Sequence, residues 1–216
     1  MPNDQLPTLR GRWALITGAS AGIGQQFAED LAAAGCNLVL CARRLDRLEA
    51  LAARLQAQHG ISVQVLVLDL AQLDACAKLQ AFLADVQLSI DVLINNAGFG
   101  LPGDFVSQEW DAHQGSLQVL LQLPTQLCRA LLPDMQARKF GLVINVASLA
   151  GLVPPSAGHT TYGAIKSYLI RFSESLALEQ QGTGVRVQAL CPGFTYSEFH
   201  DANGARGLVS QMPKWL

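Results

Sequence analysis

Short apolar runs alternate along the chain with longer stretches in which apolar residues recur every three or four positions. The short runs have the length of strands, which we predict at Trp13–Thr17, Leu38–Ala42, Val63–Leu68, Val92–Ile94, Leu142–Val146 and Val185–Leu190. The longer stretches predict helices near Gly22–Ala34, Leu45–His59, Leu73–Ala84, Gln108–Ala137 and Tyr162–Gln181. Such alternation is typical of stacked βαβ units with right-handed crossovers, so we predict a parallel sheet.

Composition agrees with one buried sheet. Hydrophobic residues make up 50% of the 216 residues and charged residues only 15%, which suits strands that are covered on both faces. We predict a single domain over residues 1–216. Glycines 35, 60, 141 and 182 lie at or just beyond the predicted helix ends, where a left-handed residue is favoured.

Several function classes are disfavoured by the charged residues and cysteines. The five cysteines are odd in number and lack C-x-x-C spacing, and the four histidines lack ligand spacing, so we predict neither disulfides nor a metal. A net charge of −2 with dispersed basic residues predicts no nucleic-acid partner. Neither a secretory signal nor an apolar run of about 18 residues is present, so we expect a cytoplasmic protein without a membrane span.

The first predicted strand leads directly into the sequence Thr17-Gly18-Ala19-Ser20-Ala21-Gly22-Ile23-Gly24 and then into a helix. This is the context of a dinucleotide site. Gly18 suits a tight turn, Gly22 lets backbone approach a pyrophosphate, and Gly24 allows close packing of helix on strand. The positive end of the helix would face the phosphates, and Ser20 can donate a hydroxyl there. An ordinary glycine-rich turn has the same spacing, so other motifs must decide.

The spacing G-x-x-x-G-x-G resembles that of the short-chain dehydrogenase/reductase family, and further family motifs follow in order. Asn95-Asn96-Ala97-Gly98 is similar to the family's N-N-A-G segment, and Pro192-Gly193 resembles its P-G turn near the nicotinamide. The resemblance implies a Rossmann-type doubly wound parallel sheet with helices on both faces, in three α/β/α layers. It also implies cofactor contacts at Gly18, Ser20, Gly22, Ile23, Gly24, Arg43, Asp69, Asn96, Ala97, Gly98, Tyr162, Lys166, Pro192, Gly193 and Thr195.

The end of the second strand favours NADP(H) over NAD(H). An acidic side chain usually accepts hydrogen bonds from the ribose hydroxyls at this place in NAD-binding sites, but Ala42 occupies it here. Arg43 and Arg44 follow, and a guanidinium can hold a 2′-phosphate. We prefer Arg43, because NADP-preferring members of the similar family carry the arginine there. The alternative is a pair of solvated arginines that open the next helix.

Tyr162 and Lys166 lie four residues apart in a predicted helix, so their side chains emerge on one face. An ammonium group beside a phenol stabilises the phenolate and lowers the pKa of the phenol. Ser148 precedes Tyr162 by 14 residues, as in the Ser…Tyr…Lys arrangement of the similar family. That resemblance implies that Tyr162 transfers a proton and that Ser148 binds the substrate oxygen. Tyr162 and Ser148 are thus the predicted substrate-binding residues.

The chain departs from the family pattern at two places. Alignment on Leu131-Leu132-Pro133 puts Leu120 where many members carry an asparagine that holds a water in a proton relay, and a leucine cannot do so. The chain also ends at Leu216, before the last helix and seventh strand of the family's sheet. We therefore expect either a fragment or a homo-oligomer in which another subunit covers the edge of the sixth strand.

The leading hypothesis is an NADP-dependent carbonyl reductase or alcohol dehydrogenase that acts on a small-molecule carbonyl or alcohol. The competing hypothesis is a catalytically impaired NADP(H)-binding module, suggested by Leu120 and the early end. A Rossmann methyltransferase would explain the glycine-rich turn but not the Ser-Tyr-Lys spacing. We expect the substrate to contact residues 154–159 and 194–215, whose composition indicates apolar substrates.

Overall fold

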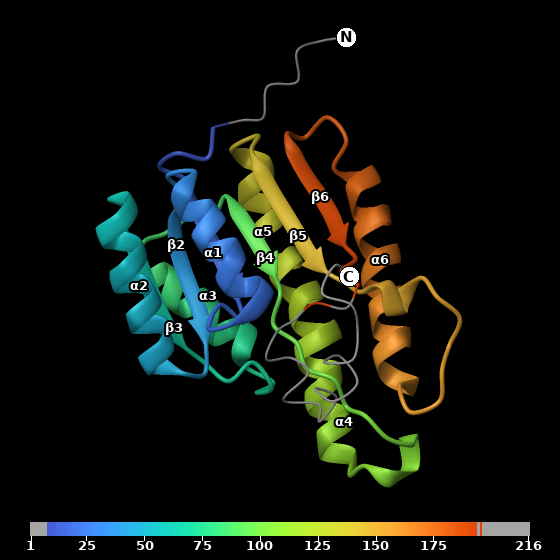
Figure 1. Cartoon of the computed structure of the whole chain (residues 1–216). Coiled ribbons are helices and arrows are strands. Elements are labelled where there is room, and N and C mark those ends of the chain that lie inside the picture. The colour runs from blue at the N-terminus through green and yellow to red at the C-terminus, as the bar shows by residue number, and fades with distance from the viewer. Residues whose placement is uncertain (1–7, 194, 196–216) are drawn as a thin grey trace.

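The computed structural model of the chain describes residues 8–193 and 195. Six parallel strands form one sheet in the order β3-β2-β1-β4-β5-β6 (Figure 1). The strands are β1 (Trp13–Thr17), β2 (Asn37–Ala42), β3 (Val63–Val67), β4 (Val92–Asn95), β5 (Gly141–Val146) and β6 (Val185–Leu190). All six predicted strands are present, and their ends differ from the prediction by at most one residue.

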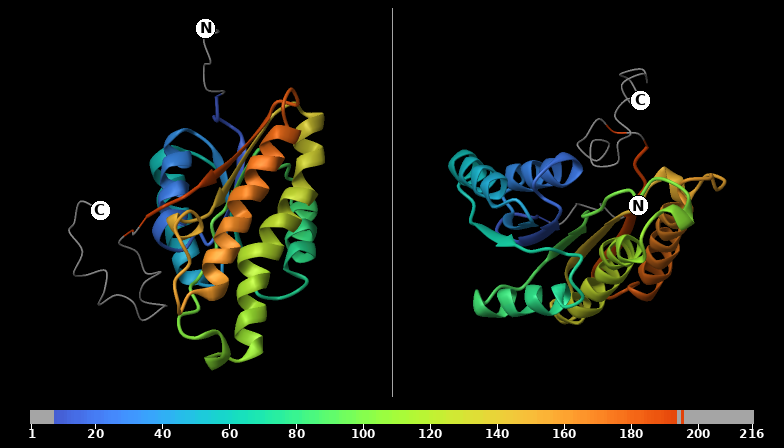
Figure 2. Two further views of the ribbon diagram at one scale, coloured as in Figure 1. Left: turned by 90° about the vertical axis from the view of Figure 1, so that its right-hand side faces the viewer. Right: turned by 90° about the horizontal axis from the view of Figure 1, so that it is seen from below.

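Helices cover both faces of the sheet. The front of Figure 1 carries α1 (Gly22–Ala33) and α2 (Leu45–His59), and the other face carries α3 (Ala75–Asp85), α5 (Leu123–Ala137) and α6 (Thr160–Glu179). The two turned views show these layers from the side and from below (Figure 2). The predicted doubly wound α/β/α fold is confirmed. No helix in the described part of the chain has both the length and the apolar character needed to cross a bilayer.

The core consists of two apolar layers, one on each side of the sheet. Leu15, Leu93 and Val143 point toward α3 and α5, whereas Ile16, Leu40 and Ile94 point toward α1 and α2. Neighbouring residues of one strand thus contribute to opposite layers, as the pleat of a strand requires. Because both layers are apolar, the central strands read as continuous hydrophobic runs in the sequence.

The long helical stretch predicted at 108–137 is divided in the structure. It consists of α4 (Trp110–Leu117), a π-helical turn η2 (Gln118–Gln122) and α5. Wide turns of this kind accommodate one extra residue and often occur at functional sites. A 3-10 turn, η1 (Phe105–Ser107), precedes α4, and another, η3 (Leu149–Gly151), follows β5.

Of the four glycines predicted to be left-handed residues at helix ends, one is not. Gly35, Gly60 and Gly182 have positive φ angles of 81°, 65° and 78°, as predicted at helix ends. Gly141 instead begins β5, and Lys139 adopts the left-handed conformation with a φ of 53°. Gly141 is needed for space, since a Cβ atom there would lie 2.8 Å from the Cβ of Met135.

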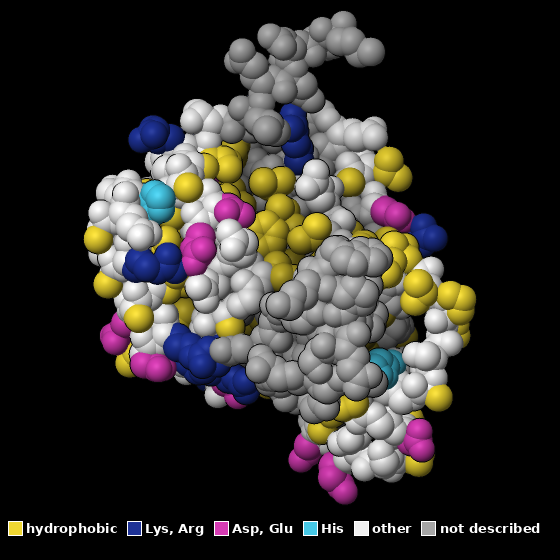
Figure 3. Space-filling model, viewed as in Figure 1, with side chains coloured by type: hydrophobic (Ala, Val, Ile, Leu, Met, Phe, Trp, Pro, Cys, Tyr) yellow, Lys and Arg dark blue, Asp and Glu magenta, His cyan; other side chains and the backbone are white. Residues whose placement is uncertain are grey.

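The front face of the sheet is unevenly covered. β1, β2 and β3 lie under α1 and α2, whereas Leu142 and Ile144 of β5 remain partly exposed. Leu190 of β6 is 40% exposed. Hydrophobic side chains accordingly gather in the middle of the face shown in Figure 3.

Candidate active site

A cavity of about 750 Å³ lies at the carboxyl edge of the sheet, where all six strands end. Chain connections diverge to opposite faces between β1 and β4, and this is the place where open α/β sheets bind ligands. Every predicted site residue except Gly24 lines the cavity, including Thr195 beyond β6. The fold therefore brings together residues from position 18 to position 195.

The turn after β1 takes the shape that its glycines allow. Gly18 and Gly22 have φ angles of 67° and 55°, in the left-handed region that favours glycine. Gly24 lies behind the turn, where a Cβ atom would be 2.3 Å from the carbonyl oxygen of Gly18. Gly24 thus allows α1 to pack against the turn, as predicted, but does not itself face the cavity.

A set of hydrogen bonds ties this turn to the segment that follows β4. The Thr17 hydroxyl accepts hydrogen bonds from the backbone N–H groups of Asn96 and Ala97, both at 3.0 Å. The Asn96 amide donates to the carbonyl oxygens of Thr17 at 2.9 Å and Gly18 at 3.2 Å. Asn96 therefore fixes one wall of the cavity against the glycine-rich turn.

Both arginines after β2 line the cavity, but they differ in their contacts. Arg44 donates from Nη2 to the Ser20 hydroxyl at 3.0 Å and from Nε at 3.3 Å, whereas Arg43 is exposed. The expected preference for Arg43 over Arg44 therefore stays a prediction, since both side chains reach the cavity. Asp69 also lines the cavity, and its carboxylate accepts the Ala71 N–H at 3.1 Å.

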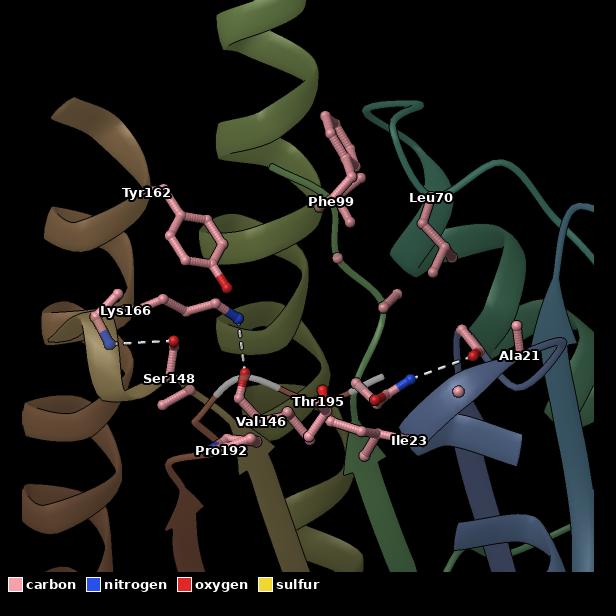
Figure 4. Close-up of a pocket in the computed structure, with 18 of the residues that line it drawn as sticks. Ala21, Ile23, Leu70, Phe99, Val146, Ser148, Tyr162, Lys166, Pro192 and Thr195 are labelled. Atoms are coloured by element: carbon pink, nitrogen blue, oxygen red, sulfur yellow. Dashed lines mark hydrogen bonds between the residues drawn. The ribbon is translucent and has the colours of Figure 1, made fainter. Parts of the chain in front are cut away.

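At the opposite end of the cavity, Ser148 precedes η3 and both Tyr162 and Lys166 project from the first turns of α6 (Figure 4). The Ser148 hydroxyl accepts the Ala150 N–H at 3.1 Å, so its own hydrogen remains available for donation. Lys166 donates from Nζ to the Val146 carbonyl at 2.7 Å. Nζ also lies 5.5 Å from the centre of the Tyr162 ring. The three predicted catalytic residues thus share one corner.

A buried polar network holds α6 against the sheet at this corner. The Asn95 amide donates to the Asn145 side-chain oxygen at 2.8 Å, and the Asn145 amide donates to Ser173 Oγ at 2.9 Å. Ser173 in turn donates to the Leu169 carbonyl at 2.7 Å. The network connects β4, β5 and α6, and Asn145 and Ser173 had not been predicted to matter. The side chains of Asn145 and Ser173 are buried where β4, β5 and α6 pack together.

Close backbone contact brings Ser148 beside the helix. A Cβ atom on Gly151 would lie 2.7 Å from the backbone carbon of Lys166, so η3 packs directly on α6. The Ser167 hydroxyl donates to the Gly151 carbonyl at 2.8 Å across the same contact. The segment between Ser148 and Tyr162, residues 149–161, therefore returns to the same corner.

Burial dominates the pKa values at this corner. Burial raises the pKa of Tyr162, and a hydrogen bond with Ser148 opposes that rise. The net shift of the Tyr162 pKa is upward, which is opposite to the lowering expected from Lys166. Burial lowers the pKa of Lys166 from 10.5 to about 8, and only 5% of that residue is exposed.

Leu120 lies in η2 beneath the cavity wall and is 1% exposed. A Cβ atom on Gly98 would lie 2.8 Å from Leu120 Cδ2, so the two residues are in contact. The leucine therefore fills the space below the Asn96–Gly98 segment. This position is apolar and closely packed.

Among the described residues, three buried cysteines are unsuited to act as nucleophiles. Burial raises the pKa of Cys36, Cys41 and Cys128 to about 12, so these thiols stay protonated. No group of three or more histidine, cysteine or acidic side chains is placed to hold a metal ion in this part of the chain.

A family model described as short chain dehydrogenase matches residues 12–206. The chain belongs to the short-chain dehydrogenase family. The match runs from the start of β1 past the end of β6, so it includes every residue of the site described above.

Relatives within this family are about one third identical to the chain. A short chain dehydrogenase of Pseudocercospora fijiensis is 35% identical over 211 residues, which are 95% of this chain and 66% of the relative. An uncharacterized oxidoreductase of Myxococcus xanthus is 36% identical over 192 residues, 89% of this chain and 75% of the relative. A very-long-chain 3-oxoacyl-CoA reductase of Laccaria bicolor is 32% identical over 202 residues, with coverage of 93% and 60%. The chain thus spans 60% to 75% of the length of these relatives.

Solved structures of other short-chain dehydrogenases superpose well. One from Sphingobium yanoikuyae in complex with NADPH has a TM-score of 0.87 and 35% identity, over 94% of this chain and 78% of that one. A bulky-bulky ketone specific alcohol dehydrogenase from Comamonas testosteroni has a TM-score of 0.80 and 37% identity, over 85% and 72%. L-sorbose reductase from Gluconobacter frateurii, complexed with NADPH and L-sorbose, has a TM-score of 0.81 and 30% identity, over 93% and 80%.

The family motifs do not include the side chains on the substrate side of the cavity. Ser156 and His159 line it, within the expected range 154–159, but Phe99, Leu149 and Val153 were not predicted. These three residues lie in the segments after β4 and β5, which carry no family motif. Their position next to Asn96–Gly98 and Ser148 in the sequence could have indicated that they line the site. Phe194 and residues 196–215 lie outside the described residues.

Proposed function

We propose that this short-chain dehydrogenase transfers a hydride between NADP(H) and a carbonyl or alcohol substrate, with Tyr162 as the proton-transferring residue. The observation that carries the proposal is the placement of Ser148, Tyr162 and Lys166 at one end of a cavity whose other end is the glycine-rich turn. The complete set of polar groups favours an enzyme over a binding module. A bound nicotinamide cofactor would supply the hydride, and the protein would supply orientation and a proton.

The residues around the turn fit a dinucleotide. Gly18 and Gly22 expose backbone at the beginning of α1, whose positive end favours phosphate. Ala42 leaves the ribose without a carboxylate partner at the end of β2, and the guanidinium groups of Arg43 and Arg44 are present at the cavity instead. These features support NADP(H), as do the NADPH complexes of two similar structures.

The Ser20 hydroxyl has a further use in this arrangement. It accepts from Arg44, so its own hydrogen is available for a phosphate oxygen. Arg44 can thus orient Ser20 and contribute positive charge at the same place. We propose that Arg43 and Arg44 act together on the 2′-phosphate, rather than Arg43 alone.

At the reacting end, each residue has a distinct task in the proposed mechanism. Ser148 donates its hydroxyl hydrogen to the substrate oxygen, and this bond strengthens as negative charge develops there. Tyr162 gives its proton to the same oxygen during reduction. Burial favours the neutral phenol, and a positive charge beside it would ease release of the proton during the reaction. Lys166 places a buried positive charge beside the phenol, with one N–H fixed by Val146.

Tyr162→Phe tests the proposal, and Tyr168→Phe is its matched control on the same helix. Tyr168 hydrogen-bonds Thr125 at 3.0 Å and does not line the cavity. We expect Tyr162→Phe to lower turnover by at least ~10²-fold, the scale of a lost general acid. Both variants should bind NADPH like the native protein. Near-native turnover by Tyr162→Phe contradicts the assignment. NADPH binding by the native protein without turnover in a broad carbonyl screen favours the binding module.

We also propose that the protein is a homo-oligomer. In the described part of the chain β6 pairs only with β5, and an unpaired sheet edge tends to associate. Light scattering after gel filtration measures the assembly. A strictly monomeric protein at micromolar concentration contradicts this part of the proposal.

A further inference from the structure

Two loops form the mouth of the cavity on the substrate side. One follows β4 and covers residues 99–109, and the other follows η3 and covers residues 152–159. They meet where the Gly103 N–H donates to the Gly158 carbonyl at 3.1 Å.

The inner wall at the mouth is largely apolar. Phe99, Leu149 and Val153 line the cavity beside Ser148 and Tyr162. Leu149 and Val153 are 45% and 50% exposed. Side chains of this type gain free energy when an apolar ligand replaces the water on their surface.

Exposed apolar side chains also lie outside the cavity, on both loops and at Trp110, the first residue of α4. Leu152 is 60% exposed on one loop, and Phe105, Val106 and Trp110 are 47%, 89% and 61% exposed on the other side of the Gly103 contact. Single exposed apolar residues are ordinary, but a group on two joined loops at a cavity mouth indicates a binding surface. We call these four residues the apolar rim.

The ionised side chains on the two described loops and at the start of α4 have one sign. Residues 99–111 contain Asp104, Glu109 and Asp111, and neither they nor residues 149–160 contain a lysine or arginine. The basic groups Arg43 and Arg44 lie at the other end of the cavity, where the cofactor phosphates are proposed to bind. Figure 3 shows acidic side chains at the lower end over α4 and basic ones at the start of α2.

We propose that the site takes uncharged carbonyl compounds with a bulky apolar body, and that it disfavours thioesters of phosphate-bearing carriers. This inference rests on the proposed function. The apolar body would lie along Val153 and the apolar rim while the carbonyl oxygen reaches Ser148 and Tyr162. NADPH would give its hydride to the carbonyl carbon and Tyr162 its proton to the oxygen, which leaves an alcohol and NADP⁺. A phosphate-bearing carrier would stay at the mouth, where the carboxylates repel it and the described loops offer no cation.

A matched pair of substrates tests the charge. Ethyl 3-oxododecanoate and the coenzyme A thioester of 3-oxododecanoate share the reacting group and the alkyl chain but differ in phosphate charge. With saturating NADPH at low salt, we expect kcat/KM for the ester to exceed that for the thioester by at least ~10-fold. Added salt should narrow the gap, because it screens repulsion between exposed charges over about 10 Å at 0.1 M.

The Asp104→Lys variant tests whether carboxylate repulsion causes the preference for the ester, with Asp104→Asn as its control. Asp104 is exposed, so either variant should fold. We expect the thioester-to-ester ratio of kcat/KM to rise severalfold in Asp104→Lys and less in Asp104→Asn, because repulsion is reversed in one and only removed in the other. A ratio that does not move in either variant contradicts repulsion at the mouth.

A series of methyl ketones from 2-butanone to 2-decanone tests the apolar surface. Each methylene that contacts an apolar wall should raise kcat/KM about 4-fold, and Leu152→Ser should weaken this gain for the longer ketones. A flat series overturns the apolar part of the inference. If the thioester is reduced as fast as the ester or faster, the inference that the site disfavours phosphate-bearing carriers is wrong, and the proposed function still stands. Absence of turnover with every carbonyl, while NADPH binds, overturns the proposed function itself.

Discussion

Replacing Leu120 with asparagine restores the residue type that many relatives carry, so it separates a lost proton relay from a packing role. The leucine is 1% exposed, and its Cδ2 atom contacts Gly98 in the cavity wall. The structure therefore offers an apolar, filled environment. We expect the variant to lose stability without gaining turnover.

The magnitude follows from the two changes that the substitution makes. Removing a fully buried leucine side chain from the core costs about 1.5–3 kcal/mol of the free energy of unfolding. Burying an amide without partners costs about 1–3 kcal/mol more. A total of about 2.5–6 kcal/mol is a large share of the roughly 5–15 kcal/mol that is usual for a domain. For a chain of this size it corresponds to a fall in Tm of roughly 10 °C.

The assay combines thermal unfolding with a pH–rate profile. Leu120→Met is the control, because it keeps volume and apolar character and should cost less than about 1.5 kcal/mol. We expect Leu120→Asn to unfold well below both the native protein and this control, with an unchanged profile shape. A native Tm together with higher turnover at alkaline pH refutes the packing argument, since it means that the amide has recruited a water in a relay.

Three further outcomes test the site. Since burial lowers the pKa of Lys166 from 10.5 to about 8, the folded state binds fewer protons than the unfolded state between these values. Stability of the cofactor-free protein should therefore gain from Lys166 as pH rises through that window, and thermal unfolding of Lys166→Met should lack this gain. Arg43→Ala and Arg44→Ala should each weaken NADPH binding by about 1.5–3 kcal/mol in calorimetry and leave NADH binding nearly unchanged; a loss confined to one variant contradicts shared binding. Gly24→Ala should lower Tm because its Cβ meets the Gly18 carbonyl at 2.3 Å. Gly115→Ala, in an open part of α4, should raise stability by up to ~1 kcal/mol.

The sequence by itself determined the sheet, the order of its elements and most of the site. Apolar strand-length runs are visible because both faces of a central strand are buried, so local composition reports the tertiary environment directly. Parallel strands place all their carboxyl ends at one edge, so motifs that follow Thr17, Asn95 and Val146 had to meet there. The helical spacing predicted that Tyr162 and Lys166 share one face, and the family resemblance added Ser148 to the same corner.

Only the tertiary structure decided features that depend on which side chain meets which across the fold. The left-handed residue after α5 is Lys139 rather than the expected Gly141, and Gly141 instead leaves room for Met135 beside β5. Arg44, the residue just before α2, reaches Ser20 across the cavity, a contact between side chains 24 residues apart. Residues 99–111 meet residues 149–160 through a contact between Gly103 and Gly158, and no local pattern records a contact between loops 55 residues apart. Secondary structure is specified by neighbours in sequence, whereas these contacts are specified by the packing of distant segments.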